Sequence, residues 1–286
     1  MKARWLLAIA LLAIGSTQGS AADAKTKRLL LVTDSGGFVH DSVGLAEEIL
    51  KEIGPKNGFT VTCFRFTREP NEEVLAKYSE AFRRVTKLPV EKENCGRVNK
   101  ETLKNFDVVL FFTTGNPLTK DELTDLQDWV KAGGAFAGTH CATDTLYNTT
   151  YGELIGGYFV NHPWHQKIKV TVEDPKHAAA AGFKTGDEIT DEIYQFRDAP
   201  YSREKLHIIM SVDNSSIDTN KKDVVRKDKD FAIAWCQEYG KGRSFYTSLG
   251  HNKHVWKDER FQQHLFGGLK WTVKQADGSA APSGKQ

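Results

Sequence analysis

Residues 133–144 read Gly-Gly-Ala-Phe-Ala-Gly-Thr-His-Cys-Ala-Thr-Asp, and this stretch decides the fold that we expect. A short apolar run, 135–137, follows a helical pattern and two glycines, and a second helical pattern comes after it. Strand, abrupt turn and helix is the geometry that raises one side chain above the carboxyl edge of a parallel sheet. Gly138 leaves room for the turn, because a Cβ there would crowd the following helix. We therefore expect His140 or its neighbour at the apex; the alternative is an ordinary strand-to-helix loop.

The chain before this stretch alternates between strand and helix patterns. Ser42 can cap a helix that begins at Val43, and Thr119 with Glu122 forms a capping box at the start of another. The strand patterns lie at 28–33, 60–66 and 107–112, and the helical patterns follow 42, 71 and 119. This alternation predicts an α/β fold, a doubly wound and mostly parallel sheet with helices on both faces.

The chain after this stretch is less regular. Strand patterns lie at 166–172, 191–196, 206–212, 231–237 and 242–248, and a helix is expected over 258–273. The charged run 218–230 is predicted to be a solvated loop. Small and polar residues dominate 275–286, which we expect to be a disordered tail. The folded domain is thus predicted to span 25–274.

The first 24 residues have the order of an export signal. Lys2 and Arg4 precede an apolar run, 6–14, and small residues follow at 20–24. Nine apolar residues are too few to span a bilayer, so we expect an exported protein, periplasmic or extracellular, that is not inserted in the membrane. Cleavage after Ala22 would lower the basic count from 39 to 37, against 37 acidic residues. This balance provides no electrostatic basis for binding nucleic acid.

The four cysteines do not form a recognisable metal or redox motif. Cys63 and Cys236 lie in strand patterns and are expected to be buried thiols, whereas Cys95 lies in a polar loop and is expected to be the most exposed. Four cysteines allow three pairings, and the spacing does not choose among them. Because no Cys-x-x-Cys occurs, a cysteine zinc site is not expected.

Several polar residues follow the strands of the predicted sheet. His40 follows the first strand, Thr114 the third, His140 the fourth and His251 the last. The carboxyl ends of parallel strands share one edge, and doubly wound folds bind their ligands there. We therefore expect these side chains to meet in one cleft.

Four motifs carry a resemblance to a known family. They are Gly-Gly-Ala-Phe-Ala-Gly-Thr-His at 133–140, Asn-His-Pro at 161–163, Asp-Glu-Ile-Tyr at 191–194 and Tyr-Gly-Lys-Gly-Arg-Ser-Phe-Tyr-Thr-Ser-Leu-Gly-His at 239–251. Over residues 28–273 the chain resembles the ThuA-like, or trehalose-utilisation, domain family. The resemblance implies the class I glutamine amidotransferase-like fold, a flavodoxin-like α/β sandwich.

The resemblance does not extend to amidotransferase chemistry. Those enzymes place a nucleophilic cysteine at the turn in a Gly-x-Cys pattern, whereas Gly138-Thr139-His140 puts a histidine there. Cys141 comes one residue late, and one residue around a tight turn points a side chain elsewhere. We therefore do not expect glutamine amidotransferase or cysteine peptidase activity.

The resemblance and the strand-end positions together single out the candidate site. His140, His251 and Glu192 are the predicted catalytic residues, although which of Asp191 and Glu192 faces the cleft is open because strand alternation turns only one toward it. The predicted substrate-binding residues are His40, Asp41, Thr114, Asn161, His162, Trp164, His165 and Asp191. Trp164 is expected to stack on a sugar ring, with core packing as the alternative.

The family link implies a carbohydrate as the ligand, either a disaccharide or a keto-sugar derivative. Acid–base chemistry would suit elimination or isomerisation of a keto-sugar by a lyase or isomerase, or hydrolysis of a glycosidic bond. The alternative is a non-catalytic sugar-binding or accessory domain that uses the same cleft, and a homo-oligomer is an open alternative to a monomer. His40, His140 and His251 are also candidate ligands for a divalent metal such as zinc, although acid–base catalysis needs none.

Overall fold

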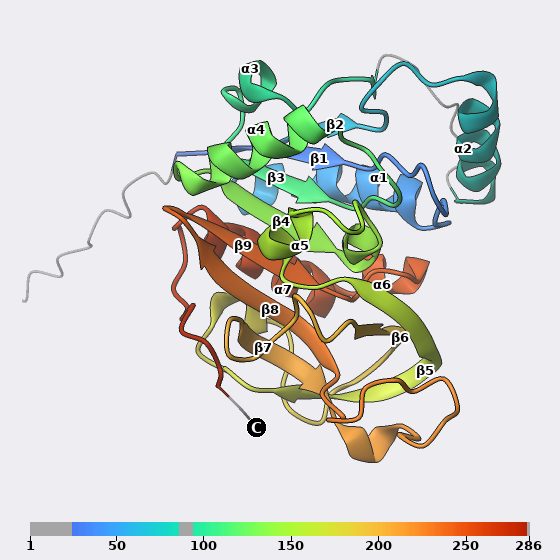
Figure 1. The fold of residues 1–286 in the computed structure, drawn as a ribbon, viewed down its shortest axis with the longest axis vertical. Helices are drawn as coiled ribbons and strands as arrows, with labels where there is room; N and C mark the ends of the chain where they lie inside the picture. Colours follow the sequence, from blue (N-terminus) through green and yellow to red (C-terminus); the bar gives the residue numbers. More distant parts are fainter. Residues whose placement is uncertain (1–24, 86–93, 285–286) are drawn as a thin grey trace, which may run out of the picture.

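The computed structural model describes residues 25–85 and 94–284, which fold around a nine-stranded mixed sheet (Figure 1). The strand order is β2-β1-β3-β4-β9-β8-β7-β5-β6. The strands are β1 Lys27–Val32, β2 Phe59–Phe64, β3 Val108–Phe111, β4 Ala135–Thr139, β5 Phe159–Val172, β6 Glu188–Phe196, β7 His207–Val212, β8 Ala232–Tyr239 and β9 Gly242–Thr247. The helices are α1 Val43–Ile53, α2 Glu72–Val85, α3 Lys100–Leu103, α4 Lys120–Lys131, α5 Tyr151–Ile155, α6 Lys253–Lys257 and α7 Glu259–Thr272.

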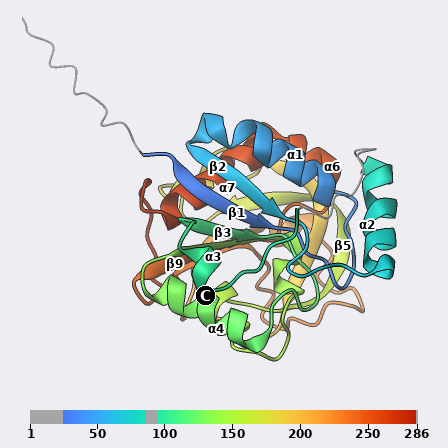
Figure 2. The same cartoon turned by 90° about the horizontal axis from the view of Figure 1, so that it is seen from above.

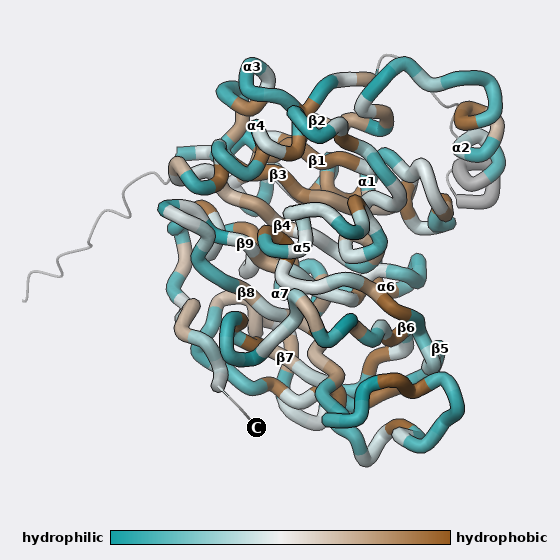
Figure 3. Tube along the Cα trace, in the orientation of Figure 1, coloured by the Kyte–Doolittle hydropathy of each residue, from teal (hydrophilic) through white to brown (hydrophobic). Residues whose placement is uncertain are grey.

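Five strands form the parallel half of the sheet. The neighbours β2, β1, β3, β4 and β9 all pair in parallel, and the helices that connect them cover both faces (Figure 2). Leu29 and Leu31 of β1 pack in one core with residues of α1 and α7, whereas Leu30 and Val32 pack in the other core with residues of α4. Apolar residues dominate β1 and β3 (Figure 3). The predicted doubly wound α/β sandwich is confirmed for this half.

The other half of the sheet is antiparallel, so the expectation of a mostly parallel sheet is only partly met. β9 pairs with β8, β8 with β7, β7 with β5 and β5 with β6, all in antiparallel orientation. Parallel neighbours need a crossover of a dozen or more residues, whereas antiparallel strands can be joined by a tight turn. Only Gly240 and Lys241 separate β8 from β9, so these two strands form a hairpin.

The two predicted helix caps have different outcomes. The side chain of Thr119 accepts from the backbone N–H of Glu122, and the Glu122 carboxylate accepts from the backbone N–H of Thr119, so the capping box is confirmed. Ser42 precedes α1 but makes no capping hydrogen bond. Its hydroxyl instead donates to the backbone carbonyl of Gly250, 3.1 Å away. The prediction for Ser42 was wrong because a distant carbonyl competes successfully for the hydroxyl.

Residues 275–284 are ordered along the antiparallel half, contrary to the expected disordered tail. The backbone N–H of Ser283 donates to the carbonyl of Leu206, and the Ser283 hydroxyl accepts from the N–H of Ile208. Ala281 contacts the ring of His207 through its carbonyl oxygen. Composition was a poor guide here because backbone groups, which every residue carries, hold this segment in place.

All four cysteines are free thiols. Cys63 and Cys236 are buried as predicted, and Cys95 is the least buried of the four. No helix within 25–85 or 94–284 is long and apolar enough to cross a membrane. Residues 1–24, for which we predict an export signal, lie outside the described residues.

Candidate active site

His140 occupies the apex of the turn after β4. β4 ends at Thr139, and a 3-10 helix, His140–Thr143, begins at once. The backbone of His140 has φ 46°, a left-handed conformation that few residues other than glycine adopt. A Cβ at Gly138 would come within 2.5 Å of Ile155 Cδ1 and 2.8 Å of Ala142 Cβ, so glycine is required before the turn. The predicted elbow is confirmed, with His140 itself at its apex.

Hydrogen bonds orient the buried ring of His140. Nδ1 lies 2.9 Å from the carbonyl oxygen of Ser248, which can only accept, so Nδ1 carries the proton. Nε2 therefore keeps its lone pair, and it lies 2.9 Å from the hydroxyl of Tyr194 on β6. Burial holds the pKa of His140 well below its ordinary value, and the neighbouring His40 adds to this effect. The ring is thus a neutral acceptor at this edge of the sheet.

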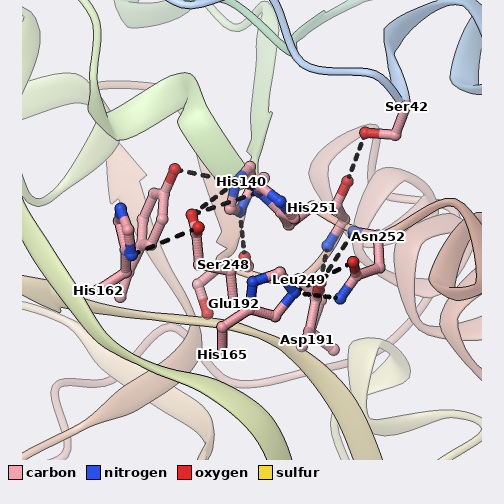
Figure 4. Close-up of polar contacts among 12 residues, drawn as sticks. Ser42, His140, His162, His165, Asp191, Glu192, Ser248, Leu249, His251 and Asn252 are labelled. Carbon is pink, nitrogen blue, oxygen red and sulfur yellow. Dashed lines mark hydrogen bonds and ion pairs between the residues drawn. The ribbon is translucent and has the colours of Figure 1, made fainter. Parts of the chain in front are cut away.

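Glu192 brings a carboxylate to the same point (Figure 4). Its Oε2 lies 3.6 Å from His140 Nε2 and 3.3 Å from His251 Nδ1, and its Oε1 lies 3.4 Å from His162 Nδ1. Burial raises the pKa of Glu192, but the hydrogen bond and charge of His251 outweigh burial, and the net shift is downward. Glu192 is therefore the acidic residue that faces the cleft.

Asp191 does not face the cleft, and its side chain binds the backbone of the loop that carries His251. It is fully buried, its Oδ2 accepts from the backbone N–H of Gly250 at 2.7 Å, and its Oδ1 accepts from that of Asn252 at 2.9 Å. These bonds hold the loop on both sides of His251. The choice between the two acidic residues, which alternation left open, is thereby settled, and the expected substrate contact from Asp191 is replaced by loop positioning.

His40 and His251 complete a group of three converging histidines. The ring centroid of His40 lies 4.8 Å from that of His140 and 5.3 Å from that of His251. Nδ1 of His251 is 3.2 Å from Nε2 of His140. Burial, reinforced by His251, lowers the pKa of His40 to about 3. Burial also acts to lower the pKa of His251, but Glu192 outweighs it and raises that pKa. The predicted convergence at one sheet edge is observed.

His40, Glu192 and His251 border a cavity of about 370 Å³, which we call the histidine cleft, and His140 lies fully buried behind them. The cleft is lined by Phe38, His40, Asp144, Phe159, His162, Glu192, Tyr194 and His251. Phe38 is 64% exposed, so a large apolar ring stands at the surface of the cleft. A hollow of about 450 Å³ elsewhere contains Arg203 and Asp230, but these charges already pair with each other at 2.9 Å. The histidine cleft is therefore the better candidate for chemistry.

The other predicted binding residues divide between the rim and the scaffold. His162 and His165 are exposed on β5, and His165 contacts Asn252 while its ring lies 4.9 Å from that of His251. Asp41 lies outside the cleft lining, 4.0 Å from the ammonium of Lys253.

Three of the predicted binding residues lie outside the lining of the histidine cleft. The hydroxyl of Thr114 donates to the carbonyl of Phe38 and thereby holds the loop before His40. Asn161 is engaged by Gln195 and by the carbonyl of Asp223. Trp164 is fully buried, with its ring 4.8 Å from that of Phe231, so it packs in the core and offers no stacking platform. Register shifts between residues 159 and 164 of β5 interrupt the alternation of side chains, so Trp164 faces inward although His162, two residues earlier, is exposed.

Tyr194 is the functional candidate that the sequence analysis did not single out. It lies two residues after Glu192 on β6, so strand alternation places both side chains on one face. Burial raises the pKa of Tyr194 well above its ordinary value, so the phenol stays protonated and remains a donor. The same period-two argument could have identified it once Glu192 was chosen.

Cys141 does not line the histidine cleft. Its side chain is fully buried, and burial raises the pKa of its thiol well above the ordinary value. A reactive cysteine needs an accessible thiolate, which this environment disfavours. The geometry agrees with the prediction that no thiol chemistry occurs here.

Comparison with known proteins adds a family and a fold. The sequence profile of the ThuA family, described as trehalose utilisation, matches residues 28–272. A ThuA-like protein from Bacteroides uniformis ATCC 8492 superposes with a TM-score of 0.67 at 19% identity, covering 92% of this chain and 98% of that one. A second, from Parabacteroides merdae ATCC 43184, has a TM-score of 0.61 at 14% identity, with 90% and 93% covered. At these identities the two structures establish the fold alone. A search of curated proteins found no match.

Proposed function

Because the chain belongs to the ThuA, or trehalose-utilisation, family, we propose that the histidine cleft processes a carbohydrate, either a disaccharide or a keto-sugar derived from one. The observation that carries the proposal is the mutual contact of His140, His251 and Glu192, whose facing atoms are 3.2 to 3.6 Å apart. Two imidazoles and a carboxylate in a partly enclosed cavity are the groups that acid–base catalysis requires.

The surroundings of each group support different roles in proton transfer. His251 is the best proton donor, because its pKa is raised and it is only partly buried. The carboxylate of Glu192 is the acceptor that lines the cleft, and the fully buried His140 is a neutral acceptor behind it. The phenol of Tyr194, 2.9 Å from His140, can donate a hydrogen bond to an oxygen on which negative charge develops.

These roles suit two reactions of sugars. With a keto-sugar, an acceptor removes the proton beside the carbonyl, the electron pair moves onto the carbonyl oxygen, and Tyr194 or His251 stabilises the resulting enolate. With an unmodified disaccharide, a donor protonates the glycosidic oxygen as its bond to the anomeric carbon breaks, and a water molecule that loses its proton to an acceptor adds to that carbon. Asp144 also lines the cleft and its pKa is raised by burial, so a second carboxyl group is present for the latter reaction.

The competing hypothesis is a non-catalytic sugar-binding domain. Such a domain would be expected to offer an open aromatic groove, whereas Trp164 is buried and the polar atoms of the cleft face one another. This difference favours an enzyme.

The proposal is tested by incubating the purified protein with trehalose, sucrose and their keto derivatives and following the sugars by NMR. We expect turnover of at least one substrate, reduced by about 100-fold or more in His251→Ala, since general acid–base catalysis contributes 10²–10⁴-fold. His254→Ala is the matched control, because His254 is exposed and is not part of the cleft lining. Saturable binding without turnover would favour the binding domain, and neither binding nor turnover of any sugar would refute the carbohydrate proposal.

A further inference from the structure

Three side-chain atoms at the histidine cleft form a triangle whose sides match the distances between the ligands of a metal ion. His140 Nε2, His251 Nδ1 and Glu192 Oε2 are separated by 3.2, 3.3 and 3.6 Å. Zinc binds imidazole nitrogen and carboxylate oxygen at roughly 2.0–2.2 Å, so two neighbouring ligands of a tetrahedral ion lie about 3.3 Å apart. The three atoms therefore already have the spacing of one face of a zinc coordination sphere.

His40 supplies a fourth ligand to this arrangement. One ring nitrogen each of His40, His140 and His251 and one carboxylate oxygen of Glu192 all lie within 4.8 Å of one another. His40 is buried, and its Nδ1 has no hydrogen-bond partner among the described residues. No hydrogen bond from Nδ1 to a described residue therefore holds the His40 ring away from an ion. Small side-chain shifts would bring all four atoms to bonding distance from one ion.

The hydrogen-bonding groups that face the centre of the cluster are mainly acceptors, which also favours a cation. Because His140 Nδ1 donates to Ser248, its Nε2 presents a lone pair to the centre, and Glu192 adds a negatively charged acceptor. Without an ion, the donors that the described residues place near these acceptors are a proton on His251 Nδ1, the hydroxyl of Tyr194 and, at the other oxygen of Glu192, Nδ1 of His162. A divalent cation would satisfy the lone pairs at once.

We propose that His40, His140, His251 and Glu192 bind one divalent transition-metal ion, zinc or a cation of similar ligand preference. Three imidazoles with one carboxylate suit such an ion, whereas calcium and magnesium prefer oxygen ligands throughout. Its binding does not depend on the nature of the substrate. Its role does rest on the proposed function. With the ion bound, His140, His251 and Glu192 would be ligands and would not carry protons, and the ion would polarise a carbonyl or hydroxyl oxygen of the sugar in place of the His251 proton.

The surrounding contacts would hold the ligands in place before the ion arrives. A metal-binding histidine usually donates its second ring N–H to a carbonyl or carboxylate, as His140 does to Ser248. Asp191 fixes the backbone on both sides of His251 through the N–H groups of Gly250 and Asn252. His162, by contrast, contacts the other oxygen of Glu192 and is outside the four-ligand group.

The test is a metal titration that needs no sugar. The chelator-treated protein is titrated with Zn²⁺ by calorimetry and with Co²⁺ by visible absorption. We expect one ion per chain and a ligand-field spectrum of low coordination number. Glu192→Gln, His251→Ala and His40→Ala should each weaken binding by more than about 100-fold, since even outer-shell changes cost 10–100-fold. His254→Ala, which removes an exposed histidine outside both the four-ligand group and the cleft lining, is the matched control and should keep the stoichiometry and nearly the same affinity.

The Tyr194→Phe variant distinguishes between a metal site and a cluster that is held by hydrogen bonds alone. The hydroxyl of Tyr194 competes with an ion for the lone pair of His140 Nε2, so its removal should leave zinc affinity unchanged or increase it. Weaker binding by the phenylalanine variant would contradict this arrangement.

Two results would overturn the proposal. One is the absence of stoichiometric binding to the unmodified protein at millimolar Zn²⁺ or Co²⁺, and the other is binding that survives both Glu192→Gln and His251→Ala. Circular dichroism checks that each variant is folded; if one is not, the Co²⁺ spectrum and the shifted imidazole NMR signals of the unmodified protein identify the ligands. Metal binding without turnover of any sugar would count against the proposed function alone, whereas turnover by metal-free protein would remove the role of the ion in catalysis.

Discussion

The hydroxyl of Ser42 donates to the backbone carbonyl of Gly250, and this bond ties the loop of His40 to the loop of His251. The two residues are separated by 208 positions in the chain. His40 lies two residues before Ser42, and His251 directly follows Gly250. The bond therefore acts on the relative position of two cleft histidines.

Ser42→Ala should loosen this connection. We expect a loss of about 1 kcal/mol in the free energy of unfolding, the usual net value of one hydrogen bond, together with weaker Zn²⁺ binding or slower turnover. Urea unfolding and metal titration measure the two effects. Ser216→Ala, which removes a hydroxyl that donates to the backbone carbonyl of Asp213 and does not line the cleft, is the control. Equal effects of both variants on the site would contradict a positioning role for Ser42.

Asp191 and Glu192, adjacent in sequence, should fail in different ways when neutralised. In the native protein the two carboxylate oxygens of Asp191 accept from the backbone N–H groups of Gly250 and Asn252, whereas Asp191→Asn keeps only one acceptor oxygen. We therefore expect a loss of about 2 kcal/mol in the free energy of unfolding. Glu192→Gln keeps the shape of the side chain and should abolish most activity with a smaller effect on unfolding. Urea unfolding and an activity assay of both variants provide the comparison, and the reverse pattern would disprove the assignment.

Cys141→Ser should leave the activity largely intact, because the thiol is fully buried and His140 occupies the apex. Under native conditions an alkylating reagent should modify Cys95 first, since it is the least buried of the four thiols. Mass spectrometry of the labelled protein reports the order. Inactivation that parallels alkylation of Cys141 would revive a thiol mechanism.

His264 should make the protein sensitive to mild acid. Its ring is fully buried, and burial lowers its pKa to about 4 in the folded protein, against an ordinary value of 6.5. Between these values the unfolded chain binds a proton that the folded chain does not, so stability falls as the pH drops below 6.5. We expect a loss of about 2 kcal/mol at pH 5 relative to pH 7 from this residue.

Urea unfolding at the two pH values measures the acid effect, and the His264→Gln variant should show a smaller difference. NMR provides the direct check, because the ring signals of His264 should not titrate between pH 8 and pH 5. A midpoint near 6.5 for those signals would disprove the prediction.

The export signal predicted at residues 1–24 calls for a different measurement. Because small residues follow the apolar run, the exported protein should begin between Asp23 and Lys25. N-terminal sequencing of the protein recovered outside the cytoplasm decides the point. An exported form that retains Met1 would contradict it.

Local features of the chain were sufficient for much of this architecture. The apolar runs of β1, β3 and β4, the capping box at Thr119 and the glycine at position 138 each act within a few residues, so the strand–helix order and the elbow at His140 could be predicted. The parallel edge then placed His40, His140 and His251 together, because strand ends of one sheet meet by topology.

Other properties depended on partners far away in the chain. Ser42 bonds to Gly250 instead of capping α1, and Trp164 turns into the core because the register of β5 shifts before it. Glu192, not Asp191, enters the cleft because two backbone N–H groups of the β9–α6 loop bind Asp191. Periodicity describes how neighbours along one strand are arranged, whereas these outcomes were decided by which distant donor, acceptor or apolar surface each side chain met in the folded protein.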